Sequence, residues 1–281
     1  MIRSSNRKKI RHCNFMQAFL SAAHDSKAAV VLHNTRSCSN IALTAYRSLR
    51  ARPSGAAISG SGGDNLFSTA LDNQDAVFGG EEKLAACLTD ICEVRRRDYI
   101  LVACGCVPGV TGDDAAAVCR AVREKTGVPI LLLPGQGFMV PEGIDMTLAA
   151  ADLLFEEFTY PRWGEFPPAP DMAVLVGSSA YYISEKVFAE LRAFFRVFGI
   201  TRLCVPPVGV TKADYERLSA ARVVAALSMG VVKKAAGKAL AEKFAARLQR
   251  PLLNLNEMDA PEDLTAAFRA AGEKLGQRET S

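Results

Sequence analysis

The sequence predicts an α/β fold in which parallel sheets are flanked by helices. Short runs rich in Val, Ile and Leu alternate with longer stretches whose apolar residues recur every three or four positions. The first pattern is typical of strands buried on both faces, and the second of helices that cover a sheet. Because the two patterns alternate along the chain, we expect parallel strands joined by crossover helices.

The individual elements follow from these patterns. The expected strands are Ala28–Leu32, Ala76–Phe78, Tyr99–Ala103, Pro129–Leu133, Met172–Val176, Arg202–Val205 and Pro251–Leu255. The expected helices are Glu81–Arg97, Asp113–Lys125, Glu185–Phe198, Lys233–Arg247 and Glu262–Leu275. Phe194, Phe195 and Phe198 recur at helical spacing, which predicts that they belong to a core.

The chain of 281 residues is long enough for two medium domains. The segment Tyr160 to Pro170 contains four prolines and the single Trp, with little periodicity, and is the best candidate for a linker. We therefore expect an N-terminal α/β domain over residues 1–165 and a second α/β domain over residues 170–281.

Charge and hydropathy exclude several classes of protein. The net charge of +4 comes from 34 basic and 30 acidic residues, without the concentrated basic face that nucleic-acid binding requires. The longest strongly apolar runs fall far short of the roughly 20 residues of a membrane-spanning helix. We expect a cytoplasmic protein that binds neither nucleic acid nor membrane.

The chain contains eight cysteines, which in a reducing compartment are poor candidates for structural disulfides. Four of them lie in helical or strand-like apolar patterns, as expected for small buried residues: Cys87, Cys92, Cys119 and Cys204. The other four lie in a different context: Cys13, Cys38, Cys104 and Cys106.

Two of the predicted strands end in loops that carry cysteine. Cys38 follows the strand Ala28–Leu32, and Cys104-Gly105-Cys106 follows Tyr99–Ala103, while Cys13 precedes the first strand. Ligands of open α/β sheets lie outside the carboxyl ends of the strands, so Cys13, Cys38 and Cys106 are candidates to converge there. Soft thiolates select iron–sulfur clusters, zinc or Cu(I). Ligands from separate elements fit a cluster better than a structural zinc site built on close cysteine pairs.

The motifs together resemble the nitrogenase component 1 family. They are Cys13, Val31-Leu32-His33-Asn34-Thr35-Arg36-Ser37-Cys38, Phe67-Ser68-Thr69-Ala70, Asp75-Ala76-Val77-Phe78-Gly79-Gly80-Glu81-Glu82-Lys83-Leu84 and Cys106-Val107-Pro108-Gly109-Val110-Thr111-Gly112-Asp113-Asp114. The region from Ala173 onward resembles the family's second Rossmann-like domain. The resemblance implies Rossmann-like parallel sheets in two domains of this type, with the family's third domain absent.

The resemblance also implies a cofactor and its ligands. Cys13, Cys38 and Cys106 would bind an iron–sulfur cluster, [4Fe-4S] or a larger P-cluster-like one, at the interface of two component 1 chains. Two chains related by a twofold axis would supply six cysteines, in a homodimer or in a heterodimer with a related chain. Cys104 departs from the family pattern, which often has a hydroxyl residue there, and is either a fourth cofactor-binding residue or an idle neighbour.

Three functions remain open. The leading one is a redox protein that passes electrons from an ATP-dependent iron-protein reductase to a small-molecule or metallocofactor substrate, with unknown catalytic residues. The second is a scaffold or carrier for metallocofactor assembly, and the third is a non-catalytic interaction module. The resemblance does not extend to a dinitrogenase chain: in that family the active-site cofactor is held by a Cys of the second domain and a His of the third, and the corresponding helix region Val231 to Phe244 has no cysteine.

Other polar residues near the motifs allow two interpretations. His33 is either a hydrogen-bond donor to the cluster or substrate, or a buried histidine with its own partners. Asp113 and Asp114 either contact a redox partner or ligand, or are the N-cap and a first-turn acid of a helix. We favour the second interpretation for each.

Overall fold

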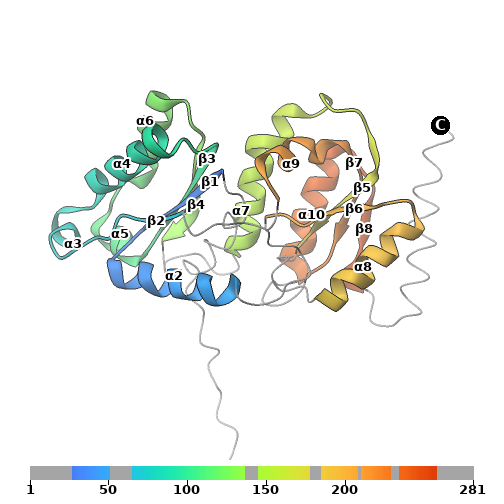
Figure 1. The fold of residues 1–281 in the computed structure, drawn as a ribbon, viewed down its shortest axis with the longest axis horizontal. Coiled ribbons are helices and arrows are strands. Elements are labelled where there is room, and N and C mark those ends of the chain that lie inside the picture. Colours follow the sequence, from blue (N-terminus) through green and yellow to red (C-terminus); the bar gives the residue numbers. More distant parts are fainter. Residues whose placement is uncertain are drawn as a thin grey trace, which may run out of the picture.

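The computed structural model describes residues 27–50, 65–136, 145–177, 185–207, 210–228 and 234–257. They form two parallel four-stranded sheets (Figure 1). The first has the order β2-β1-β3-β4, built from β1 (Ala28–His33), β2 (Leu66–Ser68), β3 (Tyr99–Cys104) and β4 (Ile130–Gln136). The second has the order β6-β5-β7-β8, built from β5 (Ala169–Val176), β6 (Arg202–Cys204), β7 (Ala221–Ala226) and β8 (Leu252–Asn254). The predicted α/β class with parallel sheets is confirmed.

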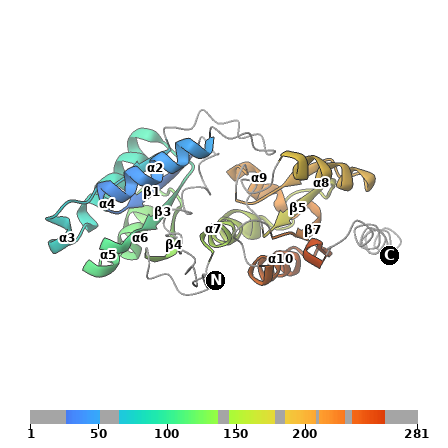
Figure 2. The same ribbon diagram turned by 90° about the horizontal axis from the view of Figure 1, so that it is seen from below.

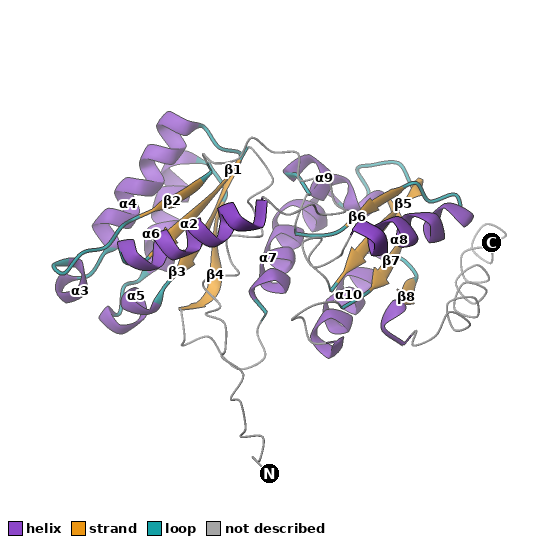
Figure 3. Ribbon diagram, turned by 60° about the horizontal axis from the view of Figure 1, so that its bottom comes forward, coloured by secondary structure: helices purple, strands orange, loops and turns teal. Residues whose placement is uncertain are grey.

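Helices cover both sheets (Figure 3). Those of the first half are α2 (Arg36–Arg50), α3 (Asp75–Phe78), α4 (Glu81–Asp90), α5 (Cys106–Thr111), α6 (Ala115–Thr126) and α7 (Met146–Leu154). Those of the second half are α8 (Glu185–Val197), α9 (Lys212–Arg217) and α10 (Lys234–Leu248). None of these described helices is long and apolar enough to cross a bilayer.

Strand β1 explains why the apolar runs are continuous rather than alternating. Its residues are all buried, and successive side chains point to opposite faces of the sheet. Ala29 and Val31 pack toward α4 and α6, whereas Val30 and Leu32 enter the core on the other face. Both faces are therefore apolar, as the sequence predicted.

The apolar core on the face of the first sheet that carries Val30 and Leu32 is shared with the second sheet. Helix α7 lies between them (Figures 1 and 2) and contacts β4 on one side and α10 on the other. Phe155, which follows α7, stacks on Phe244 of α10 with ring centroids 3.8 Å apart. Phe158 packs against Tyr99 at the start of β3, at 5.3 Å. The aromatic contacts tie the two halves into one apolar cluster.

The outer face of the second sheet is covered by α8. Phe194 and Phe195 are buried there, and Phe198 packs against them. These three residues belong to a core, as predicted. The segment Tyr160 to Pro170 contains a short 3₁₀ turn and the start of β5. The domain division at residues 165–170 stays a prediction.

Several elements differ from the sequence prediction. The expected strand Ala76–Phe78 is wrong, because these residues form α3. The carboxylate of Asp72 accepts the backbone N–H groups of Gln74 and Asp75, which starts a helical turn. Strands β2 and β7 were not predicted, and β7 is rich in Ala, a residue with little strand preference. The expected helix Glu81–Arg97 ends as a π-helical turn over Ile91–Arg95, and Glu262–Leu275 lies outside the described residues.

Candidate functional site

The candidate site lies at the carboxyl ends of β1 and β3. These strands are parallel neighbours, and their register pairs His33 with Cys104. From β1 the chain crosses to β2 on one side of the sheet, whereas β3 lies on the other side. The ends of β1 and β3 therefore flank a topological switch point, the usual ligand position in open α/β sheets.

Two of the expected ligands come to this edge. Cys38 lies in the first turn of α2, which follows β1, and Cys106 begins α5, which follows β3. Both side chains are half-buried. Cys13, the third expected ligand, lies outside the described residues. Within the segments that are described, no three His, Cys, Asp or Glu side chains gather as a metal site.

Cys104 occupies a different environment from Cys38. Its side chain is 4% exposed and packs with Cys119 in the core beneath α4 and α6. Cys38 instead packs against the core on the opposite face of the sheet. Burial raises the pKa of Cys104 to about 12, and that of Cys119 equally. At neutral pH both residues are thiols, whereas the thiolate is the form that binds metal.

The other cysteines expected in the core are also enclosed. Cys92 is buried, and Cys87 and Cys204 are partly buried against core residues. Burial raises the pKa of Cys87 and of Cys204 to about 11. Cys38 and Cys106 are partly buried, as Cys87 and Cys204 are, and differ from them by following the carboxyl ends of β1 and β3.

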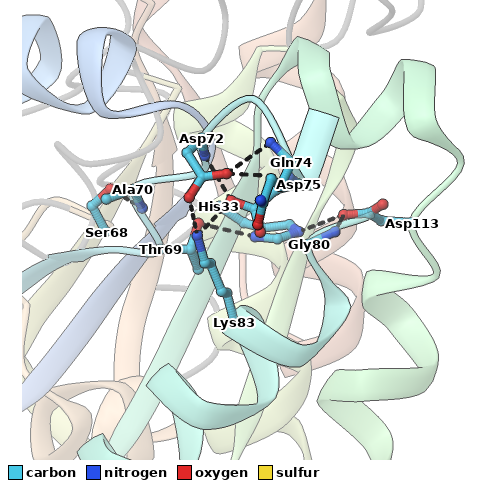
Figure 4. A network of polar contacts seen from close by, with 10 residues as sticks. All are labelled: His33, Ser68, Thr69, Ala70, Asp72, Gln74, Asp75, Gly80, Lys83 and Asp113. Carbon is cyan, nitrogen blue, oxygen red and sulfur yellow. Dashed lines mark hydrogen bonds and ion pairs between the residues drawn. The ribbon is translucent and has the colours of Figure 1, made fainter. Parts of the chain in front are cut away.

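His33 is the centre of a buried polar network (Figure 4). Its Nδ1 lies 3.1 Å from the hydroxyl of Thr69, and its Nε2 lies 3.1 Å from Oδ2 of Asp113. Burial lowers the pKa of His33, although the nearby carboxylates act in the opposite direction. A neutral imidazole has one donor and one acceptor. The network assigns Nε2–H as donor to Asp113 and Nδ1 as acceptor from Thr69.

Asp113 and Asp114 have separate tasks. The Asp113 carboxylate accepts the backbone N–H of Gly80 at 2.8 Å and the hydroxyl of Thr111 at 2.7 Å. Asp114 is the N-cap of α6 and accepts the N–H of Ala117. The interpretation as a helix cap is therefore confirmed for Asp114, whereas Asp113 joins the loop after α5 to β1 and to α4.

Gly80 permits this close packing. A Cβ at this position would lie 2.6 Å from Leu71 and 3.0 Å from the ring of His33. The Phe-Gly-Gly segment is thus required by the His33–Asp113 pair that lies against it. Four motifs quoted for the family resemblance meet in this network, through the hydrogen bonds of His33, Thr69 and Asp113 and through the close packing at Gly80.

Asn34 is a residue that the sequence analysis did not single out. It is 2% exposed, at the end of β1, and its side chain fills the space where Gly105 would otherwise carry a Cβ. The Gly between Cys104 and Cys106 was the available signal, because a glycine at a strand end often marks a close approach.

Apolar side chains are exposed beside this edge. Val77 and Phe78 of α3 are 72% and 86% exposed, and Val110 of α5 is 74% exposed. Helices α3 and α5 are in contact, so the exposed Val77, Phe78 and Val110 lie on neighbouring elements, called here the α3–α5 surface. Exposed apolar groups that cluster rather than scatter indicate an interaction site.

Comparison with known proteins decides the family. The family model described as nitrogenase component 1 type oxidoreductase matches residues 13–279. The chain belongs to this family. It superimposes on a solved structure of nitrogenase Cp1 at pH 5 with a TM-score of 0.66 and 18% identity, over 95% of this chain and 55% of that one. At this identity the likeness shows the fold of the nitrogenase component 1 family.

Curated relatives are more similar over shorter segments. The nitrogenase iron-molybdenum cofactor biosynthesis protein NifE of Clostridium pasteurianum is 42% identical over 74 residues, which are 26% of this chain and 16% of that protein. NifE of Nostoc sp. is 28% identical over 142 residues, which are 50% of this chain and 28% of that protein. The matched segments therefore span less than a third of the length of these curated relatives.

Proposed function

We propose that this nitrogenase component 1 type protein holds an iron–sulfur cluster through Cys13, Cys38 and Cys106. The observation that carries the proposal is the placement of Cys38 and Cys106, half-buried, at the ends of neighbouring parallel strands. The donor set fits the group, since thiolates are the usual ligands of iron–sulfur clusters. When bound, such a cluster supplies one-electron transfer.

The cluster would lie between two chains. Three cysteines in each chain, related by a twofold axis, supply the ligands of a shared cluster. The α3–α5 surface supports a partner at this edge, because Phe78 and Val110 lie largely exposed on elements next to Cys106. The partners proposed are a second component 1 chain and an ATP-dependent iron-protein reductase.

For the task of the cluster we propose metallocofactor assembly, in which the protein is a scaffold. The relatives named NifE support this choice, because their name describes biosynthesis of the iron-molybdenum cofactor. The second candidate is a reductase that transfers electrons to a bound substrate. The exposed side chain of Phe78 supports the reductase candidate, because electron transfer requires a donor protein to dock on the surface.

Iron content tests the cluster. The protein is purified without oxygen, and iron, acid-labile sulfide and the EPR spectrum are measured for wild type, Cys38→Ala and Cys106→Ala. Cys87→Ala is the matched control, because Cys87 is also partly buried but belongs to α4, where it packs against the core away from the sheet edge. We expect iron to be lost in the first two variants and kept in the control. Wild-type protein without iron after reconstitution would refute the proposal.

The fate of the bound metallocluster separates the two candidate tasks. Loaded protein is mixed with a metal-free acceptor, and iron in each is measured after separation. Transfer of the metallocluster in a single event supports a scaffold. Repeated reduction of a small molecule, with the metallocluster retained and a reductase present, supports the second candidate instead.

A further inference from the structure

Asn34 lies between the two cysteine-bearing loops. Its backbone N–H donates to Leu32 at 3.1 Å, and its carbonyl accepts from Leu71 at 3.0 Å, so the main chain is fixed on both sides. The side chain lies over Gly105, whose neighbour in the chain is Cys106. The carboxamide therefore lies at the switch point itself.

The polar end of Asn34 is not satisfied by the protein. Asn34 is 2% exposed, and its Oδ1 has no hydrogen-bond partner among the described residues. An unpaired buried polar atom costs about 1–3 kcal/mol, and such atoms in a native fold call for an explanation. At a strand edge flanked by ligand cysteines, that explanation is a bound group.

The two ends of a carboxamide have nearly the same shape. A half-turn about its last torsion exchanges oxygen and nitrogen at little steric cost, so the buried position of Oδ1 can equally hold two N–H donors. The sulfur atoms of a cluster and of its cysteine ligands are acceptors. Hydrogen bonds to these sulfurs are one of the means by which a protein sets the reduction potential of a cluster.

We propose that Asn34 is a positioning residue whose side-chain N–H donates a hydrogen bond to a sulfur of the cluster or of Cys106, and so raises its reduction potential. The inference rests on the proposed function, since the acceptor is the cluster. A donor favours the reduced state because the reduced cluster carries more negative charge. Gly105 has no Cβ and therefore leaves room for the carboxamide of Asn34.

The test compares wild type with Asn34→Leu, which keeps the size of the side chain and removes its donors, and with Asn34→Asp, which keeps only acceptors. Thr159→Val is the control, because Thr159 is fully buried and its hydroxyl donates to the carbonyl of Tyr215, between the two halves. Reconstituted proteins are titrated with reductant, and the midpoint potential is read from the EPR signal.

We expect both Asn34 variants to bind as much iron as wild type and to show a more negative midpoint potential, while Thr159→Val keeps the wild-type value. In wild type labelled with an isotope at the side-chain amide of asparagine, the reduced cluster should couple to that nitrogen, and the coupling should vanish in Asn34→Leu. An unchanged potential in loaded Asn34→Leu overturns the inference and leaves the cluster in place. Wild type that binds no iron overturns both proposals.

Discussion

His33 and Asp113 are 80 residues apart in the chain and form a buried pair, Nε2 to Oδ2 at 3.1 Å, with side chains 0% and 2% exposed. His33 ends β1, ahead of Cys38, and Asp113 follows α5, which begins with Cys106. The pair therefore fixes the spacing between the two cysteine-bearing loops. A polar contact that touches no ligand sets where the candidate ligands lie.

Loss of the Asp113 carboxylate should loosen this edge. In Asp113→Leu, the Nε2–H of His33, the N–H of Gly80 and the hydroxyl of Thr111 lose their acceptor. We expect a loss of roughly 3–5 kcal/mol in the free energy of unfolding, since a buried hydrogen-bonded network is broken. Urea unfolding measures it. The control Asp171→Leu removes an exposed pair with Arg202 and should cost far less.

Stability should fall as the pH drops below the ordinary pKa of histidine, 6.5. Burial lowers the pKa of His33, so the unfolded chain takes up a proton before the folded one does, and stability rises with pH in this interval. The contribution is at most about 1.4 kcal/mol per pH unit. The hydrogen bond from Lys83 lowers the pKa of Asp72 to about 2, so protonation of Asp72 affects stability only at much lower pH.

Urea unfolding of wild type and His33→Gln between about pH 7.5 and 5.5 tests this dependence. We expect a smaller pH-dependent loss in the variant, because glutamine does not titrate. Equal slopes for the two proteins would show that His33 is not the group responsible.

A methyl group at residue 80 should disturb His33. In Gly80→Ala the new Cβ lies 2.6 Å from Leu71 and 3.0 Å from the imidazole, so a neighbour must move, at a cost of about 1–3 kcal/mol. Gly127→Ala is the control, because Gly127 has φ of 71° but nothing within 4 Å of the added group. The NMR signal of the His33 ring should shift in the first variant alone.

The thiols should differ in reactivity. With a pKa of about 12, only about one Cys104 in ten thousand is a thiolate at pH 8, and packing excludes reagents as well. In metal-free folded protein we expect alkylation at Cys38 and Cys106 first, and at Cys104 and Cys119 only after unfolding. Mass spectrometry of peptides reads the order. Labelling of Cys104 as fast as Cys106 would contradict its burial and would favour the alternative in which Cys104 is a fourth ligand.

The shared core should make the two sheets unfold together. Phe244 is 0% exposed and stacks on Phe155, so Phe244→Ala should cost about 3–5 kcal/mol. Hydrogen exchange should show weaker protection in β1 and in β7 alike. Val197→Ala, at a position 76% exposed, is the control and should change neither. Protection lost in β7 alone would mean that the halves unfold independently.

The sequence alone predicted much of this architecture, because its evidence is local. Runs such as Ala28–Leu32 and Tyr99–Ala103 are apolar on both faces, and this pattern is sufficient for buried parallel strands. The glycine- and aspartate-rich motifs indicated the family, which the match over residues 13–279 confirmed. The strand predicted for Ala76–Phe78 is wrong, because the hydrogen bonds that Asp72 accepts from the N–H groups of Gln74 and Asp75 favour a helical turn over the strand suggested by the apolar run. The ligand roles of Cys13, Cys38 and Cys106 stay predictions.

Periodicity and motif spacing thus determined the fold class, most strands and the edge where cysteines gather. Only the tertiary structure decided that Cys104 packs in the core beneath α4 and α6, whereas Cys38 packs against the core on the opposite face of the sheet. It also decided that Asp113 accepts a hydrogen bond from His33 rather than capping a helix. The structure likewise places the side chain of Asn34 over Gly105, with an Oδ1 that has no hydrogen-bond partner among the described residues. These relations join residues far apart in sequence. They depend on the packing of strands and helices in three dimensions, which no local pattern encodes.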